Sequence, residues 1–104
     1  MNKEEAINIA KRYINKVNDK YIITSALLFG SCIKGTSNEN SDIDIALVIE
    51  DIPDIFEAQF ELMKLRRGID LRIEPHPFRL KDFNNQDPIV NEIMKIGYKL
   101  NISN

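Results

Sequence analysis

The sequence predicts an α/β fold of the α+β kind, in which a small mixed β-sheet is flanked by helices. Short apolar runs that suit strands alternate along the chain with segments whose apolar residues recur at helical spacing. The run Ile43–Ile49 is apolar at both strand parities, which is typical of a strand covered on both faces. With 104 residues, 43% of them hydrophobic, the chain is expected to form one domain spanning residues 1–104.

The N-terminal part of the chain predicts a helix followed by a strand. Asn2 can cap the helix, Glu5 is placed to reach back to that cap, and Asn18 follows the last helical turn. The apolar stripe of this helix consists of Ile7, Ala10, Ile14 and Val17. The first strand is expected in the later part of the segment 21–29.

The middle of the chain predicts a tight turn, a polar loop and the second strand. Gly30 ends the first apolar run, residues 31–34 suit one helical turn, and Gly35 can close it. Residues 36–41 are mostly small and polar, as is usual in a loop. The second strand, Ile43–Ile49, is expected to end before residues 51–53.

A helix and a third strand are predicted next. Asp54 can cap the helix, and Gly68 is expected to end it. Its broad apolar face consists of Ile55, Phe56, Leu62, Met63 and Leu65. The third strand is expected over residues 69–74, with Asp70 on its polar face, and Pro75 and Pro77 are expected to stop it.

The last predicted element is a helix near the C-terminus. Asp87 suits the cap and Pro88 the first helical position, where its missing N–H costs nothing. Gly97 is expected to end the helix. Its buried side is expected to consist of Ile89, Val90, Ile93 and Met94.

Charge and composition narrow the class of protein. The net charge is −2, from 14 basic and 16 acidic residues, whereas an extended nucleic-acid-binding face would make the domain basic. The single cysteine excludes an intrachain disulfide and fits a reducing compartment. Because the chain begins without an apolar signal core and has no run long enough for a membrane span, we expect a cytoplasmic location and no membrane partner. Homo-oligomerisation stays open.

Asp42 and Asp44 form the first half of a candidate site. Side chains alternate along a strand, so these two carboxylates share one face, about 7 Å apart. Like charges at that distance repel each other, and folding alone gives no reason to place them at the mouth of a buried strand. A divalent cation removes the conflict, because hard cations bind carboxylate oxygens.

Gly30 and Ser31 form the second half of the candidate site. A glycine lets the backbone approach a ligand closely, and the serine hydroxyl is a further donor. A helical turn beginning at Ser31 directs free N–H groups outward, which suits a phosphate. A phosphate cradle at one strand end and a carboxylate pair at the next together predict binding of a metal–triphosphate.

These motifs resemble the signature of the DNA polymerase beta-like nucleotidyltransferases, and most of all its small branch of minimal nucleotidyltransferases. The matching residues are Gly30-Ser31, with Lys34-Gly35 shortly after, and then Ser41-Asp42-Ile43-Asp44. The family pattern includes a third carboxylate on a later strand, and Asp70 is the residue assigned to it. Cys32 and Ile33 depart from the aromatic–alanine pair often found in the family.

The resemblance implies an enzyme that transfers a nucleoside monophosphate from an NTP, with ATP expected, to an acceptor hydroxyl. Asp42, Asp44 and Asp70 are then the catalytic and metal-binding residues for two Mg²⁺ ions, while Gly30 and Ser31 bind the phosphates. The resemblance also implies a partner protein, because such chains are often encoded beside a HEPN-type toxin and act as its antitoxin. A non-catalytic antitoxin and a transferase for small molecules such as aminoglycosides are the alternatives.

Further residues near the motif can have a role in the site or a purely structural one. Cys32 follows Ser31, and a helix N-terminus is expected to lower the pKa of its thiol. Lys34 is expected to be solvated rather than bound to the triphosphate. Arg72 and Glu74 are expected on the same strand face as Asp70, so one of them can orient Asp70 or the substrate, with a plain salt bridge as the alternative. His76 is a candidate site residue without a triad or metal set around it.

Overall fold

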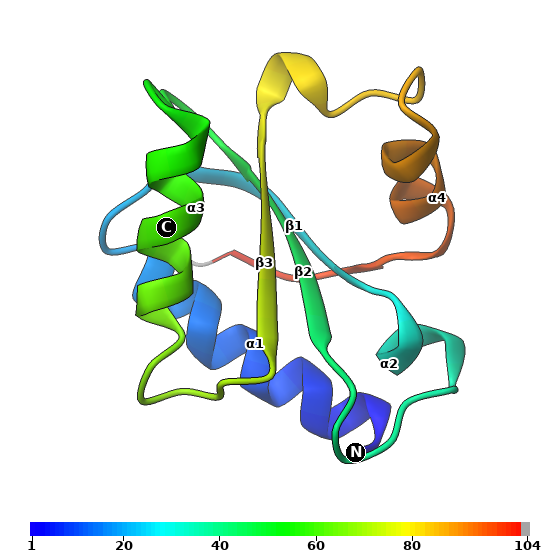
Figure 1. Cartoon of the computed structure of the whole chain (residues 1–104). Helices are drawn as coiled ribbons and strands as arrows, with labels where there is room; N and C mark the ends of the chain where they lie inside the picture. The colour runs from blue at the N-terminus through cyan, green and yellow to red at the C-terminus, as the bar shows by residue number, and fades with distance from the viewer. Residues whose placement is uncertain (103–104) are drawn as a thin grey trace.

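The computed structural model describes residues 1–102, and its elements follow the predicted order with one additional strand. Figure 1 shows the helices arranged around a twisted sheet. The helices are α1 (Lys3–Val17), α2 (Ser31–Lys34), α3 (Ile55–Leu65) and α4 (Pro88–Ile96), with a 3-10 turn η1 at Leu80–Asp82. The strands are β1 (Ile23–Phe29), β2 (Ile43–Ile49), β3 (Ile73–Arg79) and β4 (Tyr98–Lys99).

The sheet is mixed and has the order β3-β2-β1-β4. β1 is antiparallel to both β2 and β4, whereas β2 and β3 run parallel. The parallel register pairs Asp44 with Glu74 and Ala46 with His76. The small mixed sheet with flanking helices confirms the predicted fold class.

The larger part of the core lies between α1, α3 and one face of the sheet. Ile43, Ile45 and Leu47 of β2 point into this side and are fully buried. Tyr13 of α1 is also buried, and its hydroxyl donates to the carbonyl of Leu62 in α3 over 2.7 Å. Burial raises the pKa of Tyr13, so the phenol stays protonated and its hydrogen bond joins the two helices.

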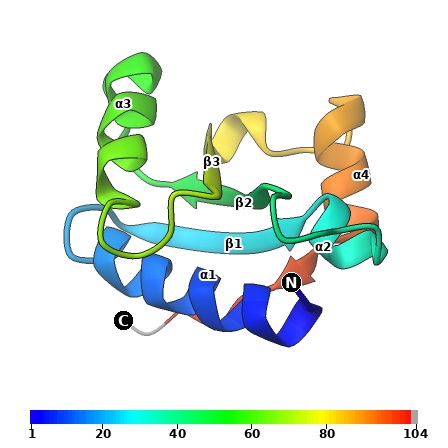
Figure 2. The ribbon, with the colours of Figure 1, turned by 60° about the horizontal axis from the view of Figure 1, so that its bottom comes forward.

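The opposite face of the sheet is covered only in part, by α4. Figure 2 shows α1 beneath the sheet and α4 rising on the other side. A second, smaller core cluster joins Ile93 of α4 to Leu27 and Ala46 of the sheet. No helix within residues 1–102 has the length and hydropathy needed to cross a membrane. The residues of β2 and β3 that α4 leaves uncovered form the open part of this face.

The predicted third strand is wrong in position. β3 begins at Ile73 rather than residue 69, and it runs through Pro75 and Pro77 instead of stopping at them. The carbonyls of Ile73 and Pro75 accept hydrogen bonds from Arg66 and Gln59 of the α3 region. The backbone N–H and C=O positions of the odd-numbered residues of β3 are therefore directed away from β2, toward the outer edge of the sheet. Both prolines therefore lie at outward-facing positions of an edge strand, where no ladder N–H is needed.

The structure also differs from the sequence expectations in β4, in α3 and in α4. β4 follows α4 directly and pairs with β1, in a segment for which no strand was predicted. Phe56, expected on the buried face of α3, is 85% exposed, because α3 turns only Ala58, Leu62 and Leu65 inward. On α4, Val90 and Ile93 are buried as predicted, but Ile89 and Met94 are exposed.

Candidate active site

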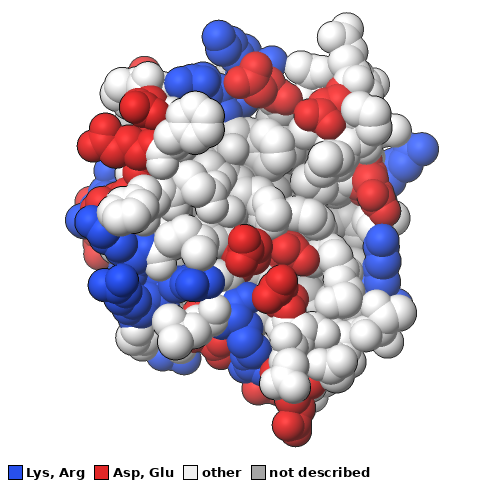
Figure 3. Space-filling model, viewed as in Figure 1, with Lys and Arg blue, Asp and Glu red and all other residues white. Residues whose placement is uncertain are grey.

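Three carboxylates lie on the open face of the sheet, at the start of the two parallel strands. Asp42 precedes β2 and Asp44 is its second residue, and alternation places both on the side opposite buried Ile43. Glu74 of β3 is the registered neighbour of Asp44. Figure 3 shows acidic side chains gathered over the N-terminal halves of β2 and β3. The predicted Asp42–Asp44 pair is thus joined by Glu74.

Gly30 lies directly against Asp44. It has φ 81° and ψ −153°, a conformation that is essentially restricted to glycine. A Cβ placed on Gly30 would collide with Oδ2 of Asp44. The first half of the predicted site therefore meets the second half, because the glycine backbone occupies the space beside the carboxylate.

α2 forms the predicted single turn after Gly30. The carbonyl of Gly30 accepts the N–H groups of Ile33 and Lys34, and Gly35 closes the turn at φ 78° in the left-handed region. Ser31 is the first residue of the turn. Lys34 forms an ion pair with Glu92 of α4, with 3.1 Å between Nζ and Oε1, so it links α2 to α4.

Cys32 does not have the environment that its position in the sequence suggested. It is 3% exposed and packs into the main core cluster, and its thiol donates to the carbonyl of Phe29. Burial raises the pKa of this thiol, whereas a lowered pKa was expected. The helix start faces the sheet on this side, so desolvation outweighs the effect of the helix N-terminus.

His76 was a candidate site residue in the sequence, and the structure places it beside Asp44. Its Nε2 lies 3.0 Å from Oδ1 of Asp44, and its ring packs against Phe29 with 5.0 Å between the ring centroids. His76 is two residues after Glu74 on β3, so both side chains point to the same face. The signal in the sequence was this spacing, which becomes visible only once β3 is extended through Pro75.

Asp70, the third predicted carboxylate, lies before β3 and not on a strand. Oδ1 of Asp70 accepts hydrogen bonds from the backbone N–H and Nε of Arg72, and Oδ2 accepts one from Nη2 over 2.8 Å. The pKa of Asp70 is lowered by these hydrogen bonds from Arg72. The carboxylate thus closes a local turn, and this is why residues 69–72 are not part of a strand.

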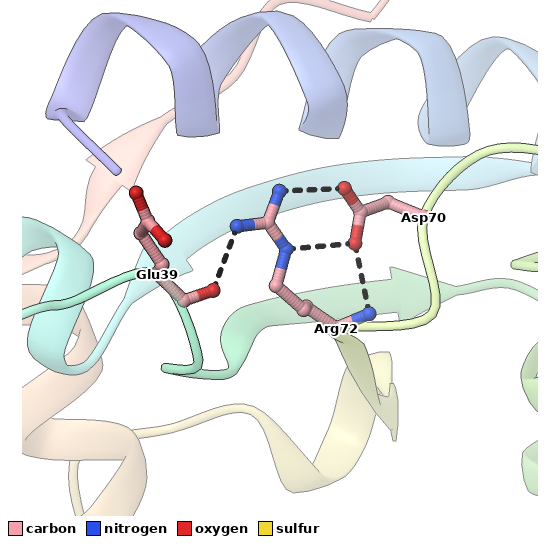
Figure 4. A network of polar contacts seen from close by, with 3 residues as sticks. All are labelled: Glu39, Asp70 and Arg72. Atoms are coloured by element: carbon pink, nitrogen blue, oxygen red, sulfur yellow. Dashed lines mark hydrogen bonds and ion pairs between the residues drawn. The ribbon is translucent and has the colours of Figure 1, made fainter.

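The guanidinium of Arg72 has a further partner. Nη1 donates to the carbonyl of Glu39, which lies in the loop leading to Asp42, over 3.0 Å. Figure 4 shows Arg72 extended between Asp70 and Glu39. Of the roles predicted for Arg72, the structure shows the salt bridge to Asp70, with 2.8 Å between Nη2 and Oδ2, together with a contact to the loop.

The chemistry of the carboxylates fits a hard divalent cation, but their side chains do not surround a common point. Asp42, Asp44 and Glu74 supply only oxygen donors, and the backbone of Gly30 lies so close to Asp44 that a Cβ there would collide with the carboxylate. Within residues 1–102, no three His, Cys, Asp or Glu side chains are close enough together to enclose a metal ion. A cation at this face would have to compete with His76 for Oδ1 of Asp44.

The hollow nearest to these carboxylates is small. It has a volume of about 160 Å³ and is lined by residues of β1, α2 and α4, among them Phe29, Gly30 and Ile93. Larger hollows lie elsewhere, such as one of about 400 Å³ between Lys20, Asp54 and Glu61. Pockets for drug-sized ligands usually measure roughly 300–1,000 Å³, so the carboxylates lie on an open surface rather than in a deep pocket.

Comparison with known proteins defines the class to which this fold and site belong. The sequence profile described as "Polymerase beta, Nucleotidyltransferase" matches residues 11–102. The chain therefore belongs to the polymerase beta-like nucleotidyltransferase family, as its motifs suggested.

Three similar proteins illustrate this relationship. A protein of Methanocaldococcus jannaschii, provisionally named a protein adenylyltransferase, is 28% identical, over 89% of this chain and 69% of its own length. A crystal structure of a provisionally assigned nucleotidyltransferase from Sulfolobus solfataricus has a TM-score of 0.62 at 19% identity, over 94% of this chain and 79% of that chain. A mutant of the toxin–antitoxin MntA–HpeT matches at TM-score 0.57 and 25% identity, over 99% of this chain and 75% of that chain.

Proposed function

We propose that this chain is a Mg²⁺-dependent nucleotidyltransferase that transfers AMP from ATP to a hydroxyl group on a partner protein. The observation that supports it best is the meeting of Gly30 with Asp44, beside Asp42 and Glu74, on the open face of the sheet. The name of the archaeal relative supports protein adenylylation, and the toxin–antitoxin neighbour supports a protein partner.

The proposed roles follow from where the residues lie. Asp42, Asp44 and Glu74 would hold two Mg²⁺ ions, with Glu74 in the role that the sequence assigned to Asp70. Bound Mg²⁺ would neutralise the triphosphate and activate the acceptor hydroxyl. Gly30 and Ser31 would bind the phosphates through the start of α2. The acceptor oxygen would then form its bond to the α-phosphorus, pyrophosphate would leave, and the hydroxyl proton would be lost to solvent.

The open surface favours an acceptor carried by a protein over a free small molecule. The hollow beside Gly30 is too small to enclose both a nucleotide and a second small substrate. A partner protein can instead present a hydroxyl-bearing side chain at the open face and supply the missing wall. The HEPN-type toxin expected from the family resemblance is the proposed partner.

The first test is the dependence of ATP binding on metal. Three carboxylates face a tetra-anionic triphosphate, so we expect the affinity for ATP to fall at least about tenfold in chelator, or about 1.4 kcal/mol. Calorimetry with and without Mg²⁺ measures this difference. Equal affinity under both conditions would refute the metal site.

The second test is transfer to the partner. The purified chain, ATP and Mg²⁺ are incubated with a HEPN-type toxin as the proposed partner, and mass spectrometry should show a gain of one AMP unit on that protein. Asp44→Asn should abolish the gain without unfolding the chain, because asparagine keeps the shape but loses the anionic ligand. Transfer to a free aminoglycoside at typical enzymatic rates, about 1–10³ per second, would contradict the open-surface argument.

A non-catalytic antitoxin is the second candidate function, and the contact between His76 and Asp44 favours it. That contact occupies Oδ1 of Asp44, one of the two oxygens of the central carboxylate. If the chain neutralises its partner by binding alone, Asp42→Asn and Asp44→Asn should still neutralise it. Loss of neutralisation in these variants, with partner binding retained, would support catalysis instead.

A further inference from the structure

The loop of residues 36–42 delivers two of the three carboxylates to the open face. It joins the end of α2 to the start of β2, so its path determines where Asp42 and then Asp44 lie. The loop is partly held by its own hydrogen bonds, such as those between Asn38 and Ser41. Ser37 also donates its hydroxyl proton to the carbonyl of Met1 over 3.0 Å. The end that leads to Asp42 is held from a different part of the chain.

Arg72 holds that end of the loop at two points. Its Nη1 donates to the carbonyl of Glu39 over 3.0 Å, and its own carbonyl accepts the N–H of Ile43 over 2.8 Å. The two contacts lie on either side of Asp42 in the sequence. The backbone that carries Asp42 is therefore fixed before and after that residue by one amino acid.

Asp70 fixes the guanidinium that makes the first of these contacts. Two nitrogens of Arg72 bind its two oxygens over 3.0 and 2.8 Å, and the Arg72 and Asp70 side chains are only 29% and 17% exposed. A bidentate pair of this kind has one favoured geometry, and the third nitrogen is then directed at Glu39. Lysine lacks the planar fork and could not bind both partners in this way.

We propose that Arg72, oriented by Asp70, is a positioning residue that sets Asp42 and Asp44 for metal binding by fixing the loop of residues 36–42. The inference rests on the proposed function for its metal, but the fixing of the loop can be measured without it. Arg72 and Asp70 touch no reacting group, so they act through the path of the backbone. Outer residues that orient metal ligands typically change metal affinity about 10–100-fold when mutated.

The test compares Arg72→Ala, Arg72→Lys and Asp70→Asn with a matched control. Lys20→Ala is the control, because it removes another ion pair, Lys20–Glu61 at 2.7 Å, which does not touch the loop. Hydrogen exchange reports on the amides of residues 38–43, and calorimetry gives the affinity for Mg²⁺ in the presence of a non-hydrolysable ATP analogue. Added guanidinium chloride at low concentration tests chemical rescue of Arg72→Ala.

We expect Arg72→Ala to speed exchange at residues 38–43 and to weaken Mg²⁺ binding about tenfold. Arg72→Lys and Asp70→Asn should show smaller changes in the same direction, free guanidinium should restore part of the affinity, and Lys20→Ala should change neither quantity. Unchanged exchange and affinity in Arg72→Ala would overturn the proposal. So would a loss of Mg²⁺ binding in Asp70→Asn alone, because that result would make Asp70 a ligand.

The proposed function and the positioning role of Arg72 can be refuted separately. If the wild-type chain binds no Mg²⁺ with the analogue, the proposed function fails, while the exchange rates of residues 38–43 still decide whether Arg72 fixes the loop. If exchange is the same in Arg72→Ala and in the wild type, the positioning role fails even where transfer of AMP is observed.

Discussion

At the scale of single residues, Gly30 is the point where the two halves of the candidate site touch. Two separate constraints favour glycine at this position, namely the positive φ and the closeness of Oδ2 of Asp44. A second glycine of the chain has only the first of them. Gly68 also has a positive φ, of 82°, but an added Cβ there would meet nothing within 4 Å. Substituting alanine at the two positions therefore compares backbone strain alone with strain plus displacement of a carboxylate.

We expect Gly68→Ala to lose about 1–2 kcal/mol of stability because it places a Cβ at positive φ, and Gly30→Ala to lose at least as much because its φ and ψ are essentially restricted to glycine. Only Gly30→Ala should also lose affinity for Mg–ATP, by about tenfold or more. The Asp44 carboxylate is the end of a short side chain, so it can swing aside at little cost in stability but leaves its place in the site. Urea unfolding and calorimetry measure the two effects, and near-wild-type affinity of Gly30→Ala would show that the carboxylate position is not critical.

Some residues of the candidate site could be identified from the sequence more easily than others. Asp44 and Glu74 each stand between a buried isoleucine and another buried residue on a strand, and Asp70 also has apolar neighbours in the sequence. Sequence alone could not separate Glu74 from Asp70, because the choice depends on where β3 begins. The side-chain hydrogen bonds of Arg72 and Arg66 set that start, and a pattern of apolar residues does not reveal them.

At the scale of elements, the predictable parts were those with strong local signals. β2 has the predicted bounds because its apolar run is long, and α4 begins where its Asp87 cap accepts the N–H of Ile89. β4 could not be predicted, since two residues contain no periodicity and pair only because β1 offers a free edge. β3 was misplaced because prolines usually end strands, and only the neighbouring strands show that this edge tolerates them.

The turn between α3 and β3 gives a prediction about pH. Hydrogen bonds from Arg72 lower the pKa of Asp70, so its stabilising effect is complete above the ordinary aspartate pKa of about 3.9. As the pH falls through the lowered pKa, the carboxyl is protonated in the folded state and the contribution is lost.

A double-mutant cycle of Asp70→Asn and Arg72→Met should therefore give a coupling energy of roughly 1 kcal/mol between pH 5 and 7. The coupling should shrink as the pH is lowered below about 4. Urea unfolding at a series of pH values measures it. A coupling that does not change down to the acid unfolding of the chain would mean that the pair is held by shape rather than by charge.

At the scale of the whole molecule, the two edge strands of the sheet determine whether it can pair with another sheet. β3 forms one edge, with Pro75 and Pro77 at outward-facing positions, and the carbonyls of Ile73 and Pro75 are occupied by Arg66 and Gln59. β4 forms the other edge and is only two residues long. Short edges and prolines are features that protect natural sheets from pairing with one another.

We expect Pro77→Ala to aggregate faster than the wild type while changing the free energy of unfolding by less than about 1 kcal/mol, because it adds an outward N–H without removing a ladder bond. Pro53→Ala, in the loop after β2, is the matched control and should not aggregate faster. Light scattering at several protein concentrations measures the difference. Equal scattering of all three proteins would show that the edge is protected by something other than proline.

The prolines of β3 also limit how another protein can bind at this side of the sheet. A segment that adds itself to a sheet is recognised largely through backbone hydrogen bonds, and that mode tolerates many sequences. Because the prolines block strand addition along β3, a protein that binds at the open face has to be recognised by its side chains and by its shape. Selectivity for one partner would then be encoded in the chemistry of the contact residues, where single substitutions in either protein can retune it.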